Sequence, residues 1–409
     1  MPTDLSIPRR PRISFLFATA PPDVWKSRFL LDTLAQHAEI QILYCEALVP
    51  RATHNFDQVQ ERLPDAEACS TMNDMLLQLI RFQPDVYIDA TSYRFRCNLL
   101  RLKLISIASV RVVIDCGPQP TPLDFGMRTS MFQRLRRLYR DPRNLLGELA
   151  DTYSRKIVDR IVMRSRQSRV TLVGGLAVDA ENLREFGSNV KPTCSFDYGT
   201  FSSFDWQTIE KNHTDEPYFV FLEDGLTGHP DYDHFRQPLP VSPEAYAASL
   251  RRFFDALSNN TGLDYVIALH PSTDQGVLKR HFPSRRLVAG MTPPLVHNAR
   301  FVVAHFSTSV NFAIMSKRPI LLITTDELDT SRFALNIQTY ARALGSTTVN
   351  IDRISSTELQ DIGRITTRPE IRLEQEFISN YIRHPNASDT HLWQTILGLG
   401  VEAASGQLR

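Results

Sequence analysis

The sequence lacks several features that would place it in a common class of protein, and each absence excludes something. No apolar run approaches the about 20 residues that a helix needs to cross a bilayer. The five cysteines are scattered, odd in number and form no C-x-x-C pair, so neither a disulfide framework nor a zinc site is indicated. The net charge is only +1, from 46 Lys and Arg against 45 Asp and Glu, so the chain as a whole does not attract nucleic acid. We therefore expect a cytoplasmic protein with no transmembrane segment and no nucleic-acid partner.

Familiar ligand motifs are also missing. There is no G-x-x-x-x-G-K-[ST] loop and no G-x-S-x-G nucleophile motif. The pair Gly174-Gly175 lacks the third glycine of a dinucleotide fingerprint. The triplet Asp231-Tyr232-Asp233 has the D-x-D form of metal-dependent sugar-nucleotide sites, but it lies in a polar loop well past the preceding apolar run. We therefore expect no metal ion and no other cofactor.

The chain does have the composition of an α/β protein and its alternation of predicted strands and helices. Apolar residues make up 42% and charged residues 22%, so the chain can bury a core. At roughly 100–200 residues per domain, 409 residues predict two domains. In the first half, short apolar runs alternate with amphipathic stretches, and the predicted strands are residues 13–17, 40–45, 85–90, 110–115 and 171–173. We expect residues 1–204 to form a Rossmann-like domain.

A second alternation follows a polar stretch at 205–217 that is typical of a linker. Its predicted strands are residues 218–222, 265–269, 287–289, 301–305 and 320–324. We expect residues 218–371 to form a second Rossmann-like domain that faces the first. Residues 372–409 carry a helical pattern and are expected to pack back on the first domain. In such folds, ligands bind where strand C-termini and helix N-termini converge.

The neutral total conceals a basic segment at 128–169, where twelve basic residues stand against four acidic ones. One interpretation is a solvated helical face. The other is that the arginines lie on anionic lipid, or recognise an anionic lipid-linked acceptor, at the cytoplasmic leaflet.

The first group of candidate functional residues is Glu223-Asp224-Gly225, directly after the predicted strand 218–222. A carboxylate at this strand end could accept a proton from a sugar hydroxyl, or could itself attack an anomeric carbon. The plainer alternative is a strand-to-loop turn, because acidic residues followed by glycine are common in turns.

Two more groups follow later strands. His270-Pro271 comes after 265–269, and an imidazole there could hydrogen-bond or protonate a phosphate. Ser307-Thr308-Ser309 opens a predicted helix, whose free backbone N–H groups and nearby hydroxyls would accommodate an anion. The alternatives are a solvated histidine and an ordinary N-cap, although one hydroxyl would suffice as a cap.

In this order, each after a strand, the three groups resemble the motif set of bacterial sialyltransferases and related capsule and lipopolysaccharide glycosyltransferases of GT-B fold. Residues 218–324 are also similar to the C-terminal domain of polysaccharide-biosynthesis proteins, notably in FFDAL, VIALHP, PLVHNARFVVAHFSTSVNFAI and KRPILL. In the first half, only DCGPQPTPLDFG and SFDYG share the resemblance.

The resemblance implies a transferase whose donor is a CMP-activated ulosonic acid, such as sialic acid or 3-deoxy-manno-octulosonic acid (Kdo). The first domain would bind the glycan or lipid-linked acceptor. Asp224, or less favourably Glu223, would be the catalytic carboxylate, and His270 would assist at the phosphate. The residues implied to bind CMP are His270, Pro271, Ser307, Thr308 and Ser309.

Several alternatives stay open from the sequence. Asp224 as a general base would invert the anomeric centre, whereas Asp224 as a nucleophile would retain it. Other GT-B enzymes fit the same pattern: a UDP-sugar transferase, a polyol-phosphate transferase or a sugar-nucleotide epimerase. A catalytically silent nucleotide- or glycan-binding relative is a further possibility.

Overall fold

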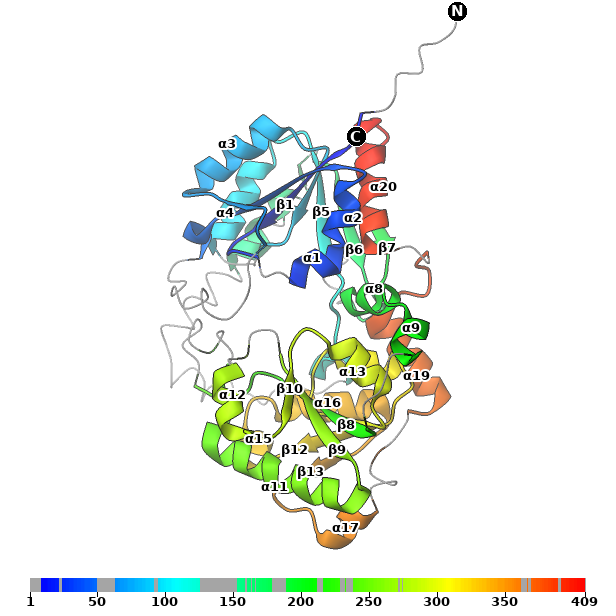
Figure 1. Cartoon of the computed structure of the whole chain (residues 1–409). Coiled ribbons are helices and arrows are strands. Elements are labelled where there is room, and N and C mark those ends of the chain that lie inside the picture. Colours follow the sequence, from blue (N-terminus) through cyan, green and yellow to red (C-terminus); the bar gives the residue numbers. More distant parts are fainter. Residues whose placement is uncertain are drawn as a thin grey trace, which may run out of the picture.

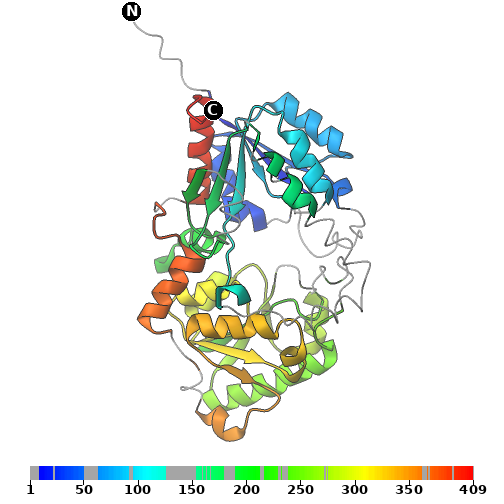
Figure 2. The ribbon, with the colours of Figure 1, turned by 180° about the vertical axis from the view of Figure 1, so that it is seen from behind.

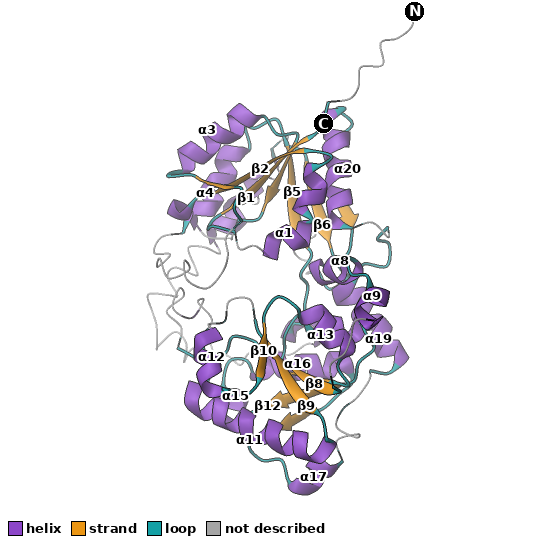
Figure 3. Cartoon of the chain, viewed as in Figure 1, coloured by secondary structure: helices purple, strands orange, loops and turns teal. Residues whose placement is uncertain are grey.

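Two α/β domains lie one above the other in the computed structural model of the chain (Figure 1). Each domain is a parallel sheet covered by helices (Figure 3). The structure describes residues 9–21, 24–49, 63–91, 95–125, 153–158, 160–162, 164–165, 167–178, 189–211, 216–228, 232, 238–270, 273, 275–361, 366, 369–388 and 391–408.

The first domain contains a seven-stranded sheet in the order β3-β2-β1-β4-β5-β6-β7. All of its neighbouring strands pair in parallel, with Ile13 opposite both Ile40 and Val86. The chain runs outward from β1 in one direction and then in the other, so the strand order reverses at the ends of β1 and β4. The strands are β1 (Arg12–Phe17), β2 (Glu39–Tyr44), β3 (Ala66–Ala68), β4 (Val86–Asp89), β5 (Val110–Asp115), β6 (Arg169–Val173) and β7 (Asn189–Pro192).

Helices cover both faces of this sheet. The labelled helices and 3-10 turns in this half of the chain are α1 (Val24–Phe29), α2 (Leu31–Ala35), η1 (Glu46–Leu48), α3 (Met72–Phe82), α4 (Phe95–Leu104), η3 (Pro122–Phe125), α8 (Phe196–Ser202) and α9 (Trp206–Lys211). Residues 153–158 and 160–162 are also helical, and η3 lies against α16 of the second domain. One core lies under α3 and α4, and the other lies under α1 and α2. Helices α1 and α2 are separate, because Leu30 between them takes a left-handed backbone conformation with φ 45°.

The second domain contains a six-stranded parallel sheet in the order β10-β9-β8-β11-β12-β13. Its strands are β8 (Tyr218–Leu222), β9 (Asp264–Ala268), β10 (Arg286–Val288), β11 (Val302–Ala304), β12 (Ile320–Thr324) and β13 (Thr348–Asn350). Its helices are α11 (Pro243–Thr261), α12 (Gln275–His281), α13 (Thr292–Asn298), α14 (Val310–Met315), α15 (Asp326–Thr330), α16 (Ala334–Leu344) and α17 (Ser356–Gln360). Strand residues alternate between two cores, because successive side chains of a strand point to opposite faces.

The C-terminal segment packs on both domains. Helix α20 (Leu392–Ala404) packs on the first domain through Leu392, Ile396 and Leu399, as predicted (Figure 1). Helix α19 (Ile371–Phe377) and the π-helical turn η4 (Ile378–Ile382) pack instead on the second domain, because Phe377 and Ile382 belong to its core. The expectation that all C-terminal helices return to the first domain is therefore correct only for α20.

Turn η4 also holds the first domain through its backbone. Leu176 N donates to Ser379 O at 3.0 Å, and Ala177 N donates to Asn380 O at 3.1 Å. Ser195 N donates to Ile382 O at 2.8 Å.

No helix in the described part of the chain is long and apolar enough to cross a membrane.

The glycine pair after β6 makes this contact possible. A Cβ on Gly175 would lie 2.1 Å from Asn380 O, so the carbonyl occupies the space of a side chain. Gly175 therefore permits the approach of η4. This position gives no support to a nucleotide-binding role for the Gly174-Gly175 pair.

We predict that Gly175→Ala lowers the free energy of unfolding by about 1–3 kcal/mol, because the backbone of η4 must move away. Gly398→Ala is the matched control: a Cβ there meets nothing within 4 Å, and alanine favours the helix by about 1 kcal/mol. Thermal or denaturant unfolding of both variants measures the difference. Equal stability of the two variants would contradict the proposed contact.

Candidate functional site

Three neighbouring strands of the second sheet end at the same edge. Strand β8 lies between β9 and β11, with Leu222 opposite Ala268 and Phe221 opposite Val303. Asp224 follows β8, His270 follows β9 and Ser307 follows β11. The structure therefore brings the three motifs together at the point where the strand order reverses, which is where open α/β sheets bind ligands.

Glu223 ties two of these strand ends together. Its Oε1 accepts from Gly225 N at 2.6 Å, and its Oε2 accepts from Thr273 Oγ1 at 2.6 Å and from His270 N at 3.3 Å. Gly225 has φ 68°, a conformation that glycine adopts at little cost. Burial raises the pKa of Glu223, and these hydrogen bonds oppose that rise. Both oxygens are engaged, so Glu223 positions the His270 backbone.

Asp224 is in a different environment. Its Oδ2 is buried and accepts no hydrogen bond from any residue in the described ranges. Burial, and then the neighbouring Glu223 carboxylate, raise the pKa of Asp224 from 3.8 to about 7, while hydrogen bonding to Ser307 and to the nearby backbone limits the rise. A carboxyl group with this pKa can donate or accept a proton near neutral pH.

A buried His–Tyr pair supports the end of β11, and the sequence analysis did not identify it. His305 Nδ1 lies 2.7 Å from Ile323 O, and its Nε2 lies 2.7 Å from the Tyr246 hydroxyl. A carbonyl only accepts, so we assign the ring proton to Nδ1, and Nε2 accepts from Tyr246. Burial lowers the pKa of His305 to about 4, which keeps the ring neutral. The pair therefore has a structural role.

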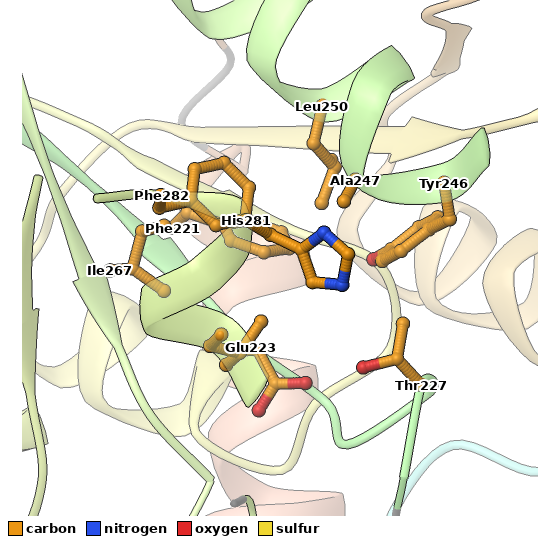
Figure 4. A pocket seen from close by; sticks show the side chains of 10 residues that line it. Phe221, Glu223, Thr227, Tyr246, Ala247, Leu250, Ile267, His281 and Phe282 are labelled. Atoms are coloured by element: carbon orange, nitrogen blue, oxygen red, sulfur yellow. The ribbon is translucent and has the colours of Figure 1, made fainter. Parts of the chain in front are cut away.

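Behind Glu223 lies a small apolar cavity, shown in Figure 4. Phe221, Tyr246, Ile267 and His281 contribute to its wall. Its volume of about 10 Å³ holds roughly one water molecule. This cavity is a packing space beneath the strand ends, and it is too small for a sugar nucleotide.

The Ser/Thr group opens the short helix α14. Ser307 Oγ accepts from Ser309 N at 3.3 Å, and Ser309 is the N-cap but makes no side-chain capping bond. Thr308 is exposed. Capping therefore does not occupy the hydroxyls of Thr308 and Ser309. Because α14 has only six residues, an anion here would depend mainly on hydroxyl and N–H donors, not on a helix dipole.

Some expected features lie outside the described residues. Pro271, Asp231 and Asp233 belong to this group, so their arrangement is not part of the site described above. Among the residues that the structure describes, no group of three or more His, Cys, Asp or Glu side chains could hold a metal ion.

The first domain contributes an ionic cluster that the sequence analysis missed. Asn311 Nδ2 donates to Asp197 Oδ2 at 2.7 Å, which joins α14 to α8. The Arg28 guanidinium lies 5.1 Å from the ring centroids of both Trp25 and Phe196. Burial lowers the pKa of Arg28 and raises that of Asp197, while their attraction opposes both shifts. In the sequence, this cluster was indicated only by the segment SFDYG, which contains Phe196 and Asp197 and shares the resemblance described above.

The segment after β5 crosses from the first domain to the second (Figure 2). Tyr340 Oη donates to Gln119 Oε1 at 3.4 Å, and Tyr381 Oη donates to Asp124 Oδ2 at 3.2 Å. Burial raises the pKa of Tyr340 well above its ordinary value, and the carboxylates of Asp224 and Asp197 add to the rise. The charges of Asp197 in the first domain and Asp224 in the second therefore both act on the Tyr340 hydroxyl.

Known structures share this architecture at low sequence identity. The glycosyltransferase SnogD from Streptomyces nogalater has a TM-score of 0.51 and 13% identity, and the match covers 96% of this chain and 100% of that one. The UDP-GlcNAc 2-epimerase from Methanocaldococcus jannaschii has a TM-score of 0.50 and 11% identity, covering 95% and 99%. No protein-family model and no curated protein sequence matches the chain.

Two Rossmann-like domains joined in this way define the GT-B fold, so the predicted fold class is confirmed. At these identities the likeness concerns the fold alone. The roles of Asp224, His270 and Ser307–Ser309 stay predictions that rest on the site itself.

We predict that Asp224→Asn becomes increasingly more stable than the unmodified protein as pH rises from about 4 to about 7. The raised pKa means that the protonated carboxyl stabilises the fold below its unfolded pKa, and that this stability is lost as pH rises through about 7. Asparagine cannot ionise, so the variant avoids the loss. Unfolding temperatures measured across this pH range give the result.

Glu358→Gln is the control with the opposite sign. Hydrogen bonds from Ser355 lower the pKa of Glu358, so its contribution is lost as pH falls. A stability difference for Asp224→Asn that does not change with pH would contradict the raised pKa.

Proposed function

We propose that the protein is a glycosyltransferase that moves an ulosonic acid, Kdo or sialic-acid-like, from a CMP-activated donor to a growing surface polysaccharide or lipopolysaccharide. The observation that carries the proposal is the Asp224 carboxyl, with a pKa of about 7 and a buried oxygen that lacks a hydrogen-bond partner among the described residues. It lies at the strand-end edge beside Ser307. As a base or nucleophile it can act on the acceptor hydroxyl or on the anomeric carbon.

The donor nucleotide would bind beside this carboxyl. His270 and the hydroxyls of Ser307, Thr308 and Ser309 follow the two strands that flank β8. A CMP leaving group carries one phosphate, so hydroxyls, backbone N–H groups and an imidazole can stabilise it without a divalent metal. Pro271 would fix the chain direction after His270.

Of the two carboxylates, Asp224 is the better catalytic candidate. The oxygens of Glu223 are held by Gly225, Thr273 and the His270 backbone. Moving Glu223 toward a substrate would release three donors. Its proposed role is therefore to hold Asp224 and His270 in place, and its charge also helps to raise the pKa of Asp224.

A sugar-nucleotide epimerase is the second candidate, favoured by the fold likeness to the UDP-GlcNAc 2-epimerase. The likeness to the glycosyltransferase SnogD favours glycosyl transfer equally well. An epimerase acts on the free nucleotide sugar, whereas a transferase needs an acceptor. Incubation of the protein with nucleotide sugars alone separates the two activities.

The proposal also includes the protein's place in the cell. The first domain would bind the acceptor, and the protein would be cytoplasmic and attached to the inner face of the membrane through the basic segment 128–169. Of that segment, the structure describes residues 153–158, 160–162, 164–165 and 167–169.

We predict that CMP raises the unfolding temperature of the purified protein more than CDP, UDP or GDP does. A ligand that binds only the folded state stabilises it by about 2.7 kcal/mol at 100 times its Kd. Thermal-shift measurements and calorimetry with the four nucleotides test this. A preference for UDP would favour a UDP-sugar enzyme, and no response to any nucleotide would favour the silent binding protein.

We predict that Asp224→Asn reduces transfer at least about 100-fold and leaves CMP affinity nearly unchanged, because the carboxyl acts in the reaction. His270→Ala should weaken CMP binding and turnover together. Glu376→Gln, an exposed carboxylate on α19, is the control and should change neither. Equal loss of CMP binding in the Asp224 and His270 variants would mean that Asp224 is structural.

A further inference from the structure

The outer surface of the first domain exposes a cluster of large apolar side chains. It is formed by α3, α4 and the helical residues at 153–158 and 160–162, called the third helix; we call this surface the three-helix face. Lys103 Nζ donates to Asn73 Oδ1 at 2.8 Å, which joins α4 to α3. Asn98 Nδ2 donates to Ser154 Oγ at 2.9 Å, which joins α4 to the third helix, seen beside it in Figure 2. The three helices therefore lie side by side.

Exposed apolar residues gather on this face more than elsewhere. Seven of the thirteen large apolar side chains recorded as exposed among the described residues belong to it. They are Leu77 and Ile80 on α3, Phe95 and Leu99 on α4, and Tyr153, Ile157 and Ile161 on the third helix. A cluster of this kind on a soluble domain marks an interaction surface more often than a solvated one.

The third helix has a regular pattern. Val158 and Val162 point into the domain, whereas Tyr153, Ile157 and Ile161 recur every fourth residue on the outside. Tyr153 is 64% exposed and Ile157 is 56% exposed. Since a purely solvated helix gains nothing from an outward apolar stripe at this spacing, the pattern favours an interaction surface over a solvated face at 153–158 and 160–162.

Positive charge borders this stripe. Lys156, Arg160 and Arg164 are exposed on the same helix, one turn from the apolar positions. Arg96 and Lys103 are exposed on α4. Apolar side chains that can enter the acyl region, bordered by bases that can meet anionic headgroups, are the pattern of a helix that lies in a membrane interface.

We propose that the three-helix face docks on an anionic lipid bilayer, with Tyr153, Ile157 and Ile161 inserted and the neighbouring Lys and Arg side chains on the headgroups. This inference extends the proposed function, because it would hold the first domain at the surface that carries a lipid-linked acceptor. The docking itself needs neither CMP nor transfer. It differs from simple electrostatic attraction because apolar insertion supplies part of the affinity.

The test is sedimentation of the full chain with vesicles of phosphatidylcholine alone or mixed with phosphatidylglycerol, at low and raised salt. We expect binding to the mixed vesicles, weakened but not abolished by salt. Ile157→Ser with Ile161→Ser should lower the partition coefficient at least about tenfold, because two buried aliphatic side chains are lost. Lys156→Glu with Arg160→Glu should lower binding mainly at low salt.

Ile371→Ser is the matched control, since Ile371 is 77% exposed but lies on α19 of the second domain. It should bind vesicles like the unmodified protein. Absence of binding to the mixed vesicles, an equal loss in Ile371→Ser, or undiminished binding in the double serine variant would each overturn the proposal. Concentration-dependent dimerisation that the serine variant abolishes would overturn it in favour of a second copy of the chain.

The nucleotide measurements keep this inference distinct from the proposed function. Vesicle binding without a CMP response would support the docking face and contradict the proposed CMP-dependent transferase. A CMP response without vesicle binding would support the proposed transferase and contradict the docking face. The serine variant should keep the CMP response of the unmodified protein, because the three-helix face belongs to the first domain, whereas Asp224 and His270 follow strands of the second.

Discussion

The buried carboxylate of Glu223 joins the ends of β8 and β9, and the candidate site depends on that junction. One oxygen accepts from Gly225 and fixes the turn that carries Asp224, while the other accepts from Thr273 and the His270 backbone. A buried charge is tolerated only when its hydrogen bonds are made, so these donors are required for the fold as well as for the site. The same charge disfavours ionisation of the adjacent Asp224.

Contacts between the domains act on the same group of residues. Asn311, in the helix opened by the Ser/Thr motif, binds Asp197 of the first domain, and Tyr340 is influenced by both Asp197 and Asp224. Turn η4 places its side chains in the core of the second domain while its backbone bonds the first. A change in the angle between the domains would therefore alter the surroundings of Asp224.

Much of the fold could be predicted from local pattern. Buried parallel strands are continuous apolar runs, so the strands at 110–115, 218–222 and 320–324 were predicted at their observed limits. Strands β3, β7 and β13 were not predicted, because they lie at or near sheet edges, are three or four residues long and have no buried apolar run. Helix α20 was expected on the first domain, but the placement of α19 on the second depends on Phe377 fitting one particular core.

By itself, the sequence determined the two α/β domains, the order of strands and helices, and the three motifs that follow strands, because these depend on hydrophobic periodicity and on residue types adjacent in the chain. Only the tertiary structure decided which of two adjacent carboxylates is engaged and which has a raised pKa, since that depends on donors 47 and 50 residues away. It also decided that Asp197 meets Asn311, 114 residues along the chain, and that three separate helices share one exposed apolar face. Such contacts follow from packing between elements, which no local pattern records.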